Sequence, residues 1–154
     1  MRIKPLEISE ISDAMLLCRK FWEETPIFSR YRWDNEKTFD IIADSITEDD
    51  SCIYIAFEDS TPVGIIRGSV EAGTFTRDKW LYADLVYVVA DKRGSSIGKK
   101  LVNKWIEFGE SKDIVDMWFS VNSGIDMNKS VEFFKSMDFK VAGMQMRKEM
   151  ECVD

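Results

Sequence analysis

The spacing of hydrophobic residues divides the first half of the chain into distinct elements. Residues 1–6 have an extended pattern that ends near a proline, which predicts a short strand. Apolar positions recur at helical spacing along residues 9–24 and again along 34–47, which predicts two amphipathic helices. The pattern then alternates in residues 52–58 and 62–70, and the short connection between them predicts a β-hairpin.

The second half begins with a run that is almost uncharged. Residues 79–90 read as a buried strand and residues 113–121 as another strand. Residues 97–111 between them predict an amphipathic helix, residues 128–137 predict a last helix, and residues 138–150 predict one or two closing strands. Helices and strands therefore alternate around one hairpin, which is typical of an α/β or α+β domain built on one sheet.

Length and composition fit a single globular domain over residues 1–154. The hydrophobic share of 45% and the charged share of 32% are ordinary for such a domain. No run approaches the roughly 20 apolar residues that a membrane span needs. The N-terminal residues also lack the apolar core of a signal peptide, so we expect no membrane association.

Charge and residue types exclude several functions. The formal net charge of −7 argues against a nucleic-acid-binding protein; it favours solubility and would also tolerate a cationic partner such as an amine. The chain has no histidine, which excludes Ser-His and Cys-His dyads and histidine bases. Cys18, Cys52 and Cys152 are scattered and form no CxxC pair, so we expect reduced thiols in a cytoplasmic protein and no metal site.

Residues 92–105, KRGSSIGKKLVNKW, place small and basic residues where a strand passes into a helix. Backbone N–H groups at such a turn, with the positive end of the helix dipole, form a site for an anion. Gly94 and Gly98 permit a close approach, and Arg93 and Lys99 add positive charge. The stretch has neither the Walker spacing nor GxGxxG. In isolation it fits both a structural turn and a phosphate cradle, and the turn is the commoner case.

The wider segment resembles the acetyl-CoA-binding segment of the GCN5-related N-acetyltransferase (GNAT) family, whose pattern is Gln/Arg-x-x-Gly-x-Gly/Ala. Arg93 matches the first position and Gly98 the last, while Ser96 stands in place of the central glycine. Residues 86–88, VYV, resemble the family's preceding strand, and residues 133–140, FFKSMDFK, resemble its late helix-to-strand junction. The order of elements resembles the family along nearly the whole chain.

The resemblance implies a fold and a coenzyme site. The fold would be α+β in three layers, with a mixed, mostly antiparallel sheet of about six to seven strands flanked by about four helices. The fourth and fifth strands would splay apart, so that an extended ligand pairs with the exposed edge of the fourth. Acetyl-CoA would be the co-substrate, and no metal is implied. The implied coenzyme-binding residues are Val86, Tyr87, Val88, Arg93, Gly94, Ser95, Ser96, Ile97, Gly98, Lys99 and Asn128.

Acetyl transfer also needs a donor to the thioester carbonyl and a base for the amine. The resemblance assigns the donor to the backbone N–H of Val88 or of a neighbouring residue. Asp84 is the candidate base, because a carboxylate within an apolar strand is costly to bury without a partner or a role. By alternation it would share a face with Tyr82, Val86 and Val88. A salt-bridged or rim-exposed Asp84 is the structural alternative.

The family's acid, a helix tyrosine, has no counterpart in this sequence. Its position falls on Phe134 or on Lys135, depending on the register, so water or another tyrosine would protonate the leaving thiolate. Residues 21–34 lie where the family walls its acceptor pocket, and a loop folded onto the core is the alternative. The implied acceptor-binding residues are Trp22, Glu23, Phe28, Tyr31 and Trp33.

Three hypotheses for the function follow. The first is an acetyltransferase that acts on a primary amine of a small molecule or peptide. The second is a non-catalytic acyl-CoA-binding sensor on the same fold, because the tyrosine is missing and a glycine is replaced. The third is a structural or interaction protein in which the Gly-Ser turn is only a turn. Formation of a homodimer stays open.

Overall fold

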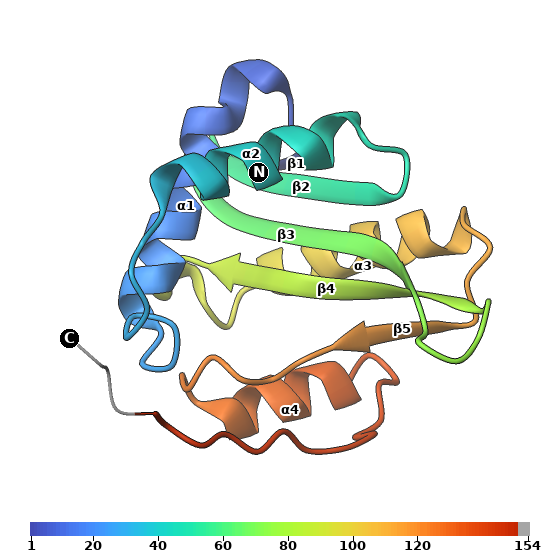
Figure 1. Ribbon diagram of the computed structural model, residues 1–154. Coiled ribbons are helices and arrows are strands. Elements are labelled where there is room, and N and C mark those ends of the chain that lie inside the picture. The colour runs from blue at the N-terminus through green and yellow to red at the C-terminus, as the bar shows by residue number, and fades with distance from the viewer. Residues whose placement is uncertain (151–154) are drawn as a thin grey trace.

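The computed structural model describes residues 1–150, and Cys152, for which a reduced thiol is expected, lies outside the described residues. Within them, strands and helices alternate along the chain (Figure 1). In chain order the elements are β1 (Arg2–Pro5), the 3-10 helix η1 (Ile8–Glu10), α1 (Ile11–Glu24), α2 (Asn35–Thr47), β2 (Ser51–Glu58), β3 (Thr61–Ala72), β4 (Lys79–Val88), the 3-10 helix η2 (Ala90–Lys92), α3 (Ile97–Glu110), β5 (Asp116–Phe119) and α4 (Met127–Lys135).

The helices form where the hydrophobic pattern predicts them. Helix α3 buries Ile97, Leu101 and Trp105 on one face, as expected from their spacing. Helix α2 begins after Asp34, whose side chain accepts a hydrogen bond from the backbone N–H of Lys37 at 2.9 Å. This cap satisfies one of the N–H groups that the first turn of a helix leaves unpaired.

The strands form one sheet in the order β1-β2-β3-β4-β5. The pairs β1–β2, β2–β3 and β3–β4 are antiparallel, and β4–β5 is parallel. Helices α1 and α2 cover one face and α3 covers the other, while α4 lies beyond β5 at the edge of the sheet (Figure 1). There Phe134 of α4 stacks on Phe119 of β5, with ring centroids 4.2 Å apart. The α+β class and the mixed sheet are thus confirmed.

The expected number of strands is wrong. The described residues form a sheet of five strands rather than about six to seven, because residues 138–150 form no strand. Their apolar side chains are largely in solvent, and Met144 and Met146 are 90% and 92% exposed. A strand persists only where a neighbouring edge accepts its backbone hydrogen bonds, and this segment lies beside no such partner in residues 1–150.

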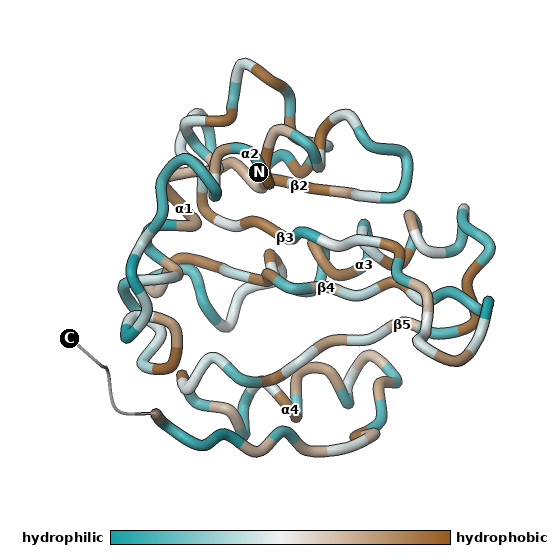
Figure 2. The backbone as a smooth tube through the Cα atoms, in the orientation of Figure 1, coloured by the Kyte–Doolittle hydropathy of each residue, from teal (hydrophilic) through white to brown (hydrophobic). Residues whose placement is uncertain are grey.

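Hydrophobic residues follow the central strands, and polar residues gather in the connecting loops (Figure 2). Ile55, Ile65 and Ile66 of β2 and β3 are completely buried. Helix α3 approaches β3 closely, since a Cβ at Gly68 would lie 2.5 Å from Nε1 of Trp105. This close contact fixes α3 against the sheet and so places the start of the helix beside the end of β4.

Candidate functional site

Within residues 1–150, no strand pairs with one edge of β4 over the second half of that strand. The pairing of β4 with β5 ends at Ala83, opposite Phe119, whereas β4 continues to Val88. Pairing with β3 persists on the other edge, where the N–H of Val89 donates to a β3 carbonyl at 3.0 Å. Successive N–H groups along a strand point to opposite edges, so those of Val88 and Val86 point to the open edge. The edge that the family resemblance leaves open to a ligand is therefore free of a strand partner within residues 1–150, because β5 itself ends at Phe119.

Asp84 lies at a β-bulge in the middle of β4. Arg67 of β3 is opposite Leu85. The next residue of β3, Gly68, is opposite Ala83, so Asp84 has no partner in the ladder. Such an extra residue locally breaks the alternation of side chains. Asp84 and Leu85 consequently line the same cavity, on the face covered by α1 and α2.

The bulge corrects the expectation that Asp84 shares a face with Val86 and Val88. Val88 lies on the opposite face, where its Cγ2 is 3.8 Å from the place that a Cβ at Gly98 of α3 would occupy. Strict alternation after the bulge puts Val86 on that α3 face as well. Sequence reasoning missed this because a bulge adds one residue without changing the hydrophobic character of the strand.

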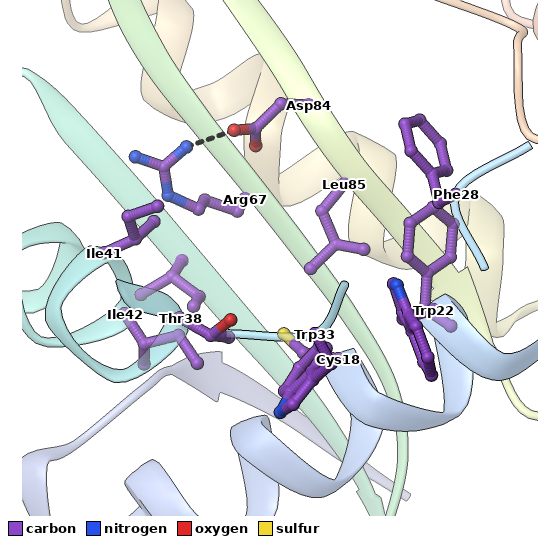
Figure 3. A pocket seen from close by; sticks show the side chains of 12 residues that line it. Cys18, Trp22, Phe28, Trp33, Thr38, Ile41, Ile42, Arg67, Asp84 and Leu85 are labelled. Atoms are coloured by element: carbon purple, nitrogen blue, oxygen red, sulfur yellow. Dashed lines mark hydrogen bonds and ion pairs between the residues drawn. The ribbon is translucent and has the colours of Figure 1, made fainter. Parts of the chain in front are cut away.

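A salt bridge holds Asp84 in place. Arg67 donates from Nη1 to Oδ2 of Asp84 (Figure 3). It also donates from Nε to Oγ of Ser45 at 2.6 Å. Burial raises the pKa of the Asp84 carboxyl above its ordinary value, although the charge of Arg67 opposes this. The Asp84 side chain remains 42% exposed, so it faces the cavity as well as its partner. The carboxylate is therefore both salt-bridged and accessible.

The cavity in front of Asp84 has a volume of ≈ 220 Å³. It lies between the sheet and helices α1 and α2, with the Asp84–Arg67 pair on one side and aromatic rings on another (Figure 3). Three of the five predicted acceptor residues, Trp22, Phe28 and Trp33, line it. The structure thus brings the predicted aromatic residues together with the candidate base, and their role in binding an acceptor stays a prediction.

The other two predicted acceptor residues lie elsewhere. Tyr31 lines an adjoining outer cavity of ≈ 230 Å³, which shares the same aromatic residues and adds Arg32 and Lys37. Glu23 lines neither cavity, and its carboxylate pairs with Nε of Arg19 at 2.7 Å. An acceptor contact by Glu23 stays a prediction to which the described structure adds no support.

The turn between β4 and α3 presents unpaired backbone N–H groups. Gly94 has φ +80°, a backbone conformation that residues with a Cβ atom rarely adopt. The hydroxyl of Ser95 donates to the carbonyl of Lys92 within the turn at 2.6 Å. In residues 1–150, the N–H groups of Ser96, Gly98 and Lys99 have no hydrogen-bond acceptor. They lie at the positive end of the α3 dipole, which is the arrangement that binds phosphate.

A cluster that the sequence does not reveal joins this turn to α1. Arg93 donates from Nε to the carbonyl of Val88 at 2.9 Å and from Nη2 to Glu24. Tyr87 donates its hydroxyl to the other oxygen of Glu24 at 2.6 Å. Burial would raise the pKa of Glu24, but the bonds from Tyr87 and Arg93 outweigh it and lower that pKa. The guanidinium is thus bound to protein groups, and a contact between Arg93 and phosphate stays a prediction.

The two candidate positions of the missing acid hold a packed aromatic ring and a lysine. Phe134 is 7% exposed and belongs to the aromatic cluster beside β5. Lys135 pairs with Glu132 at 3.3 Å. Neither register therefore places a hydroxyl where the family has its tyrosine. Asn128, a predicted coenzyme residue, lies exposed in the first turn of α4, and its role stays a prediction.

The two described cysteines are not suited to nucleophilic chemistry. Cys18 and Cys52 are free and buried, and burial raises the pKa of each thiol to about 12, which disfavours a thiolate at neutral pH.

Residues 1–150 contain no group of three or more acidic or cysteine side chains that could hold a metal ion. No helix in this part of the chain is long and apolar enough to cross a membrane.

Solved structures with a similar fold cover almost the whole chain. AAC(6')-Iy in complex with the bisubstrate analogue CoA-S-monomethyl-acetylneamine is 13% identical, with a TM-score of 0.76 over 98% of both chains. The aminoglycoside 6'-N-acetyltransferase AAC(6')-IG from Acinetobacter haemolyticus is 14% identical, with a TM-score of 0.74 over 99% of this chain and 100% of that chain. A transcriptional regulator from Bacillus halodurans C-125 is 12% identical, with a TM-score of 0.76 over 97% of this chain and 99% of that chain. At these identities the likeness concerns the fold alone.

Sequence comparison assigns the family. No curated protein sequence matches the chain. The model of the acetyltransferase (GNAT) family, however, matches residues 15–139, which include most of α1 and all of the elements from α2 to α4. The chain therefore belongs to the acetyltransferase (GNAT) family.

Proposed function

We propose that the chain transfers an acetyl group from acetyl-CoA to a primary amine of a small molecule or peptide. The observation that carries the proposal is the open edge of β4 beside the free N–H groups of the following turn. An extended amide-containing arm can pair with a strand edge, and a pyrophosphate suits the N-terminal end of a helix. The two features adjoin, so one ligand with both groups can use them together.

The residues of the turn fit coenzyme A. Gly94 and Ser96 keep side-chain bulk away from the phosphate oxygens, and Lys99 is exposed and able to add charge. Complexes of AAC(6')-Iy contain CoA or a CoA analogue, which supports acetyl-CoA as the co-substrate here. The aminoglycoside acetyltransferases among the similar folds likewise support a small-molecule amine as the acceptor.

The chain's own groups would divide the chemistry among them. Acetyl-CoA supplies a thioester carbonyl, to which the N–H of Val88 or Val86 would donate from the open edge. Asp84 would take the proton of the amine directly or through a water, and its raised pKa suits a base. Because the usual acid position holds either Phe134 or Lys135, neither of which has a hydroxyl, solvent would protonate the leaving thiolate. Cytoplasmic location and formation of a homodimer stay predictions.

The test combines binding with turnover. Acetyl-CoA and free CoA should both raise the melting temperature of the purified protein, and a panel of primary amines should cause release of the CoA thiol. No change in melting temperature with either ligand would leave the third hypothesis, a protein whose turn binds nothing. If the ligands stabilise the protein but no amine causes release of the CoA thiol, the proposed enzymatic activity is contradicted.

The absent acid favours one alternative, a non-catalytic acyl-CoA-binding sensor. Phe134 is buried in an aromatic cluster, and Oδ2 of Asp84 is engaged by Arg67. A sensor would require only the open edge of β4 and the turn, both of which are intact. It predicts stabilisation that depends on the acyl group, with no acetylated product.

A further inference from the structure

The cavity in front of Asp84 has mainly apolar walls. Besides Trp22, Phe28 and Trp33, it is lined by Ile42 and Leu85 and by other apolar side chains. The rings of Trp22 and Trp33 lie 5.9 Å apart between centroids and are tilted by 59°, so they form two sides of a corner (Figure 3). Such walls gain most from a flat apolar group that displaces water from them.

The described charged groups around the cavity can neutralise one ammonium group of a ligand. Among residues 1–150, the inner walls hold one carboxylate, Asp84, and one guanidinium, Arg67, which already share a bond. Within the same residues, the outer cavity adds Arg32 and Lys37 but only one acid, Asp34, whose side chain accepts a hydrogen bond from the backbone N–H of Lys37 at 2.9 Å. A second ammonium group would therefore lose its water beside positive charges without gaining a carboxylate.

The indole rings do not replace that missing carboxylate. Trp22 and Trp33 could in principle hold a cation against their faces. The guanidinium of Arg19 already lies 4.7 Å from the Trp22 centroid and 5.3 Å from the Trp33 centroid. The ammonium group of an acceptor is consequently directed to Asp84, whose Oδ1 has no side-chain partner within residues 1–150.

Building on the proposed function, we infer that the acceptor is a small primary monoamine with a flat apolar body, such as an arylalkylamine. The body fills the aromatic corner, and the amine lies at Asp84 on the side of the open β4 edge. The inner cavity of ≈ 220 Å³ suits a single ring system, and the outer cavity of ≈ 230 Å³ shares its aromatic walls. Polyamines and amino sugars are poor acceptors because their additional ammonium groups find no free carboxylate among the described residues of either cavity.

A competition among amines tests the inference. With acetyl-CoA fixed, 2-phenylethylamine and tryptamine are compared with spermidine and the amino sugar neamine by thiol release and by mass spectrometry of the products. We expect kcat/KM to be at least about tenfold higher for the two arylalkylamines, since even one methylene in an apolar pocket gives discrimination of that order. Preferred acetylation of spermidine or neamine would overturn the inference and leave the proposed function intact.

A pair of variants on α2 ties the preference to this cavity. Ile41 lines both cavities and is 38% exposed, whereas Phe39 is 46% exposed and lines neither. Ile41→Glu adds a carboxylate beside the aromatic corner and should lower kcat/KM for 2-phenylethylamine by about tenfold while improving spermidine. Phe39→Glu adds the same charge to the same helix and should leave kcat/KM unchanged for both amines. Equal effects of the two variants would contradict binding in this cavity.

Failure of the proposed function gives a different result. If no amine is acetylated, calorimetric titration with the same four amines, with CoA present, measures binding alone. Binding of the arylalkylamines that is lost in Ile41→Glu would support the ligand class for a protein that only binds. Absence of such binding, or binding of spermidine alone, would overturn it.

Discussion

At the scale of single residues, Asp84 joins a structural and a chemical role. The bulge turns its carboxylate into the cavity, and Arg67 holds one of its oxygens. We predict that Asp84→Asn lowers kcat by about a hundredfold or more, because a general base contributes at least that much, and leaves the Kd for acetyl-CoA unchanged. Steady-state kinetics and calorimetric titration measure the two quantities.

The matched control is Glu71→Gln, which removes an exposed carboxylate on the neighbouring strand. It should retain the kcat of the unmodified protein. If Asp84→Asn keeps nearly full turnover and Glu71→Gln loses it, Glu71 is the base and Asp84 serves only the salt bridge.

The pKa of Asp84 sets the pH dependence of the reaction. A base acts only when it is deprotonated, so activity should rise with pH through the pKa of Asp84. Burial raises that pKa and Arg67 lowers it, which places the acidic limb above the ordinary range of an aspartate. Arg67→Gln removes the opposing charge and should move the limb to still higher pH. Profiles of kcat/KM would reveal this, and a shift to lower pH would exclude Asp84 as the titrating group.

At the scale of elements, the site depends on how the turn after β4 leads into α3. A Cβ at Gly98 would meet Phe133 at 3.5 Å, an ordinary contact, so Gly98→Ala should fold and bind acetyl-CoA. The longer side chain of Gly98→Leu should extend toward Phe133 and Val88, narrow the space between α3 and the end of β4, and abolish stabilisation by acetyl-CoA. Thermal-shift curves of the two folded variants test this. Equal stabilisation of both by the ligand would mean that phosphate binds elsewhere.

A second element-scale feature is the bridge from α1 to the turn through Glu24. Arg93→Ala and Glu24→Gln remove the same contact, so their effects on the Kd for CoA should be strongly non-additive in a double-mutant cycle. A loss of CoA affinity that is equal at low and high salt would mean that Arg93 acts on the turn through this contact alone. Additive losses, with a larger effect of Arg93→Ala at low salt, would instead indicate that Arg93 binds phosphate directly.

At the scale of the whole molecule, the sequence predicts local features better than pairings between distant segments. The helices, the hairpin and the turn before α3 follow from periodicity and turn chemistry, and the structure has them. Residues 138–150 have a strand-like pattern but no partner edge among the described residues, and an alternating pattern carries no information about partners. The bulge at Asp84 depends on how β4 pairs with β3, and the bond between Glu24 and Arg93 joins residues 69 positions apart. Neither contact follows from the local sequence pattern.

Acetyl transfer is the reaction on which all these roles depend, and mass spectrometry of its products measures it directly. The purified protein is incubated with acetyl-CoA and a panel of primary amines, and the acetylated amine and the free CoA are quantified together. We expect both to appear in equal amounts for at least one amine, and Asp84→Asn to slow both alike. If a folded protein that is stabilised by acetyl-CoA yields no acetylated amine from the panel, the claim of acetyl transfer is contradicted.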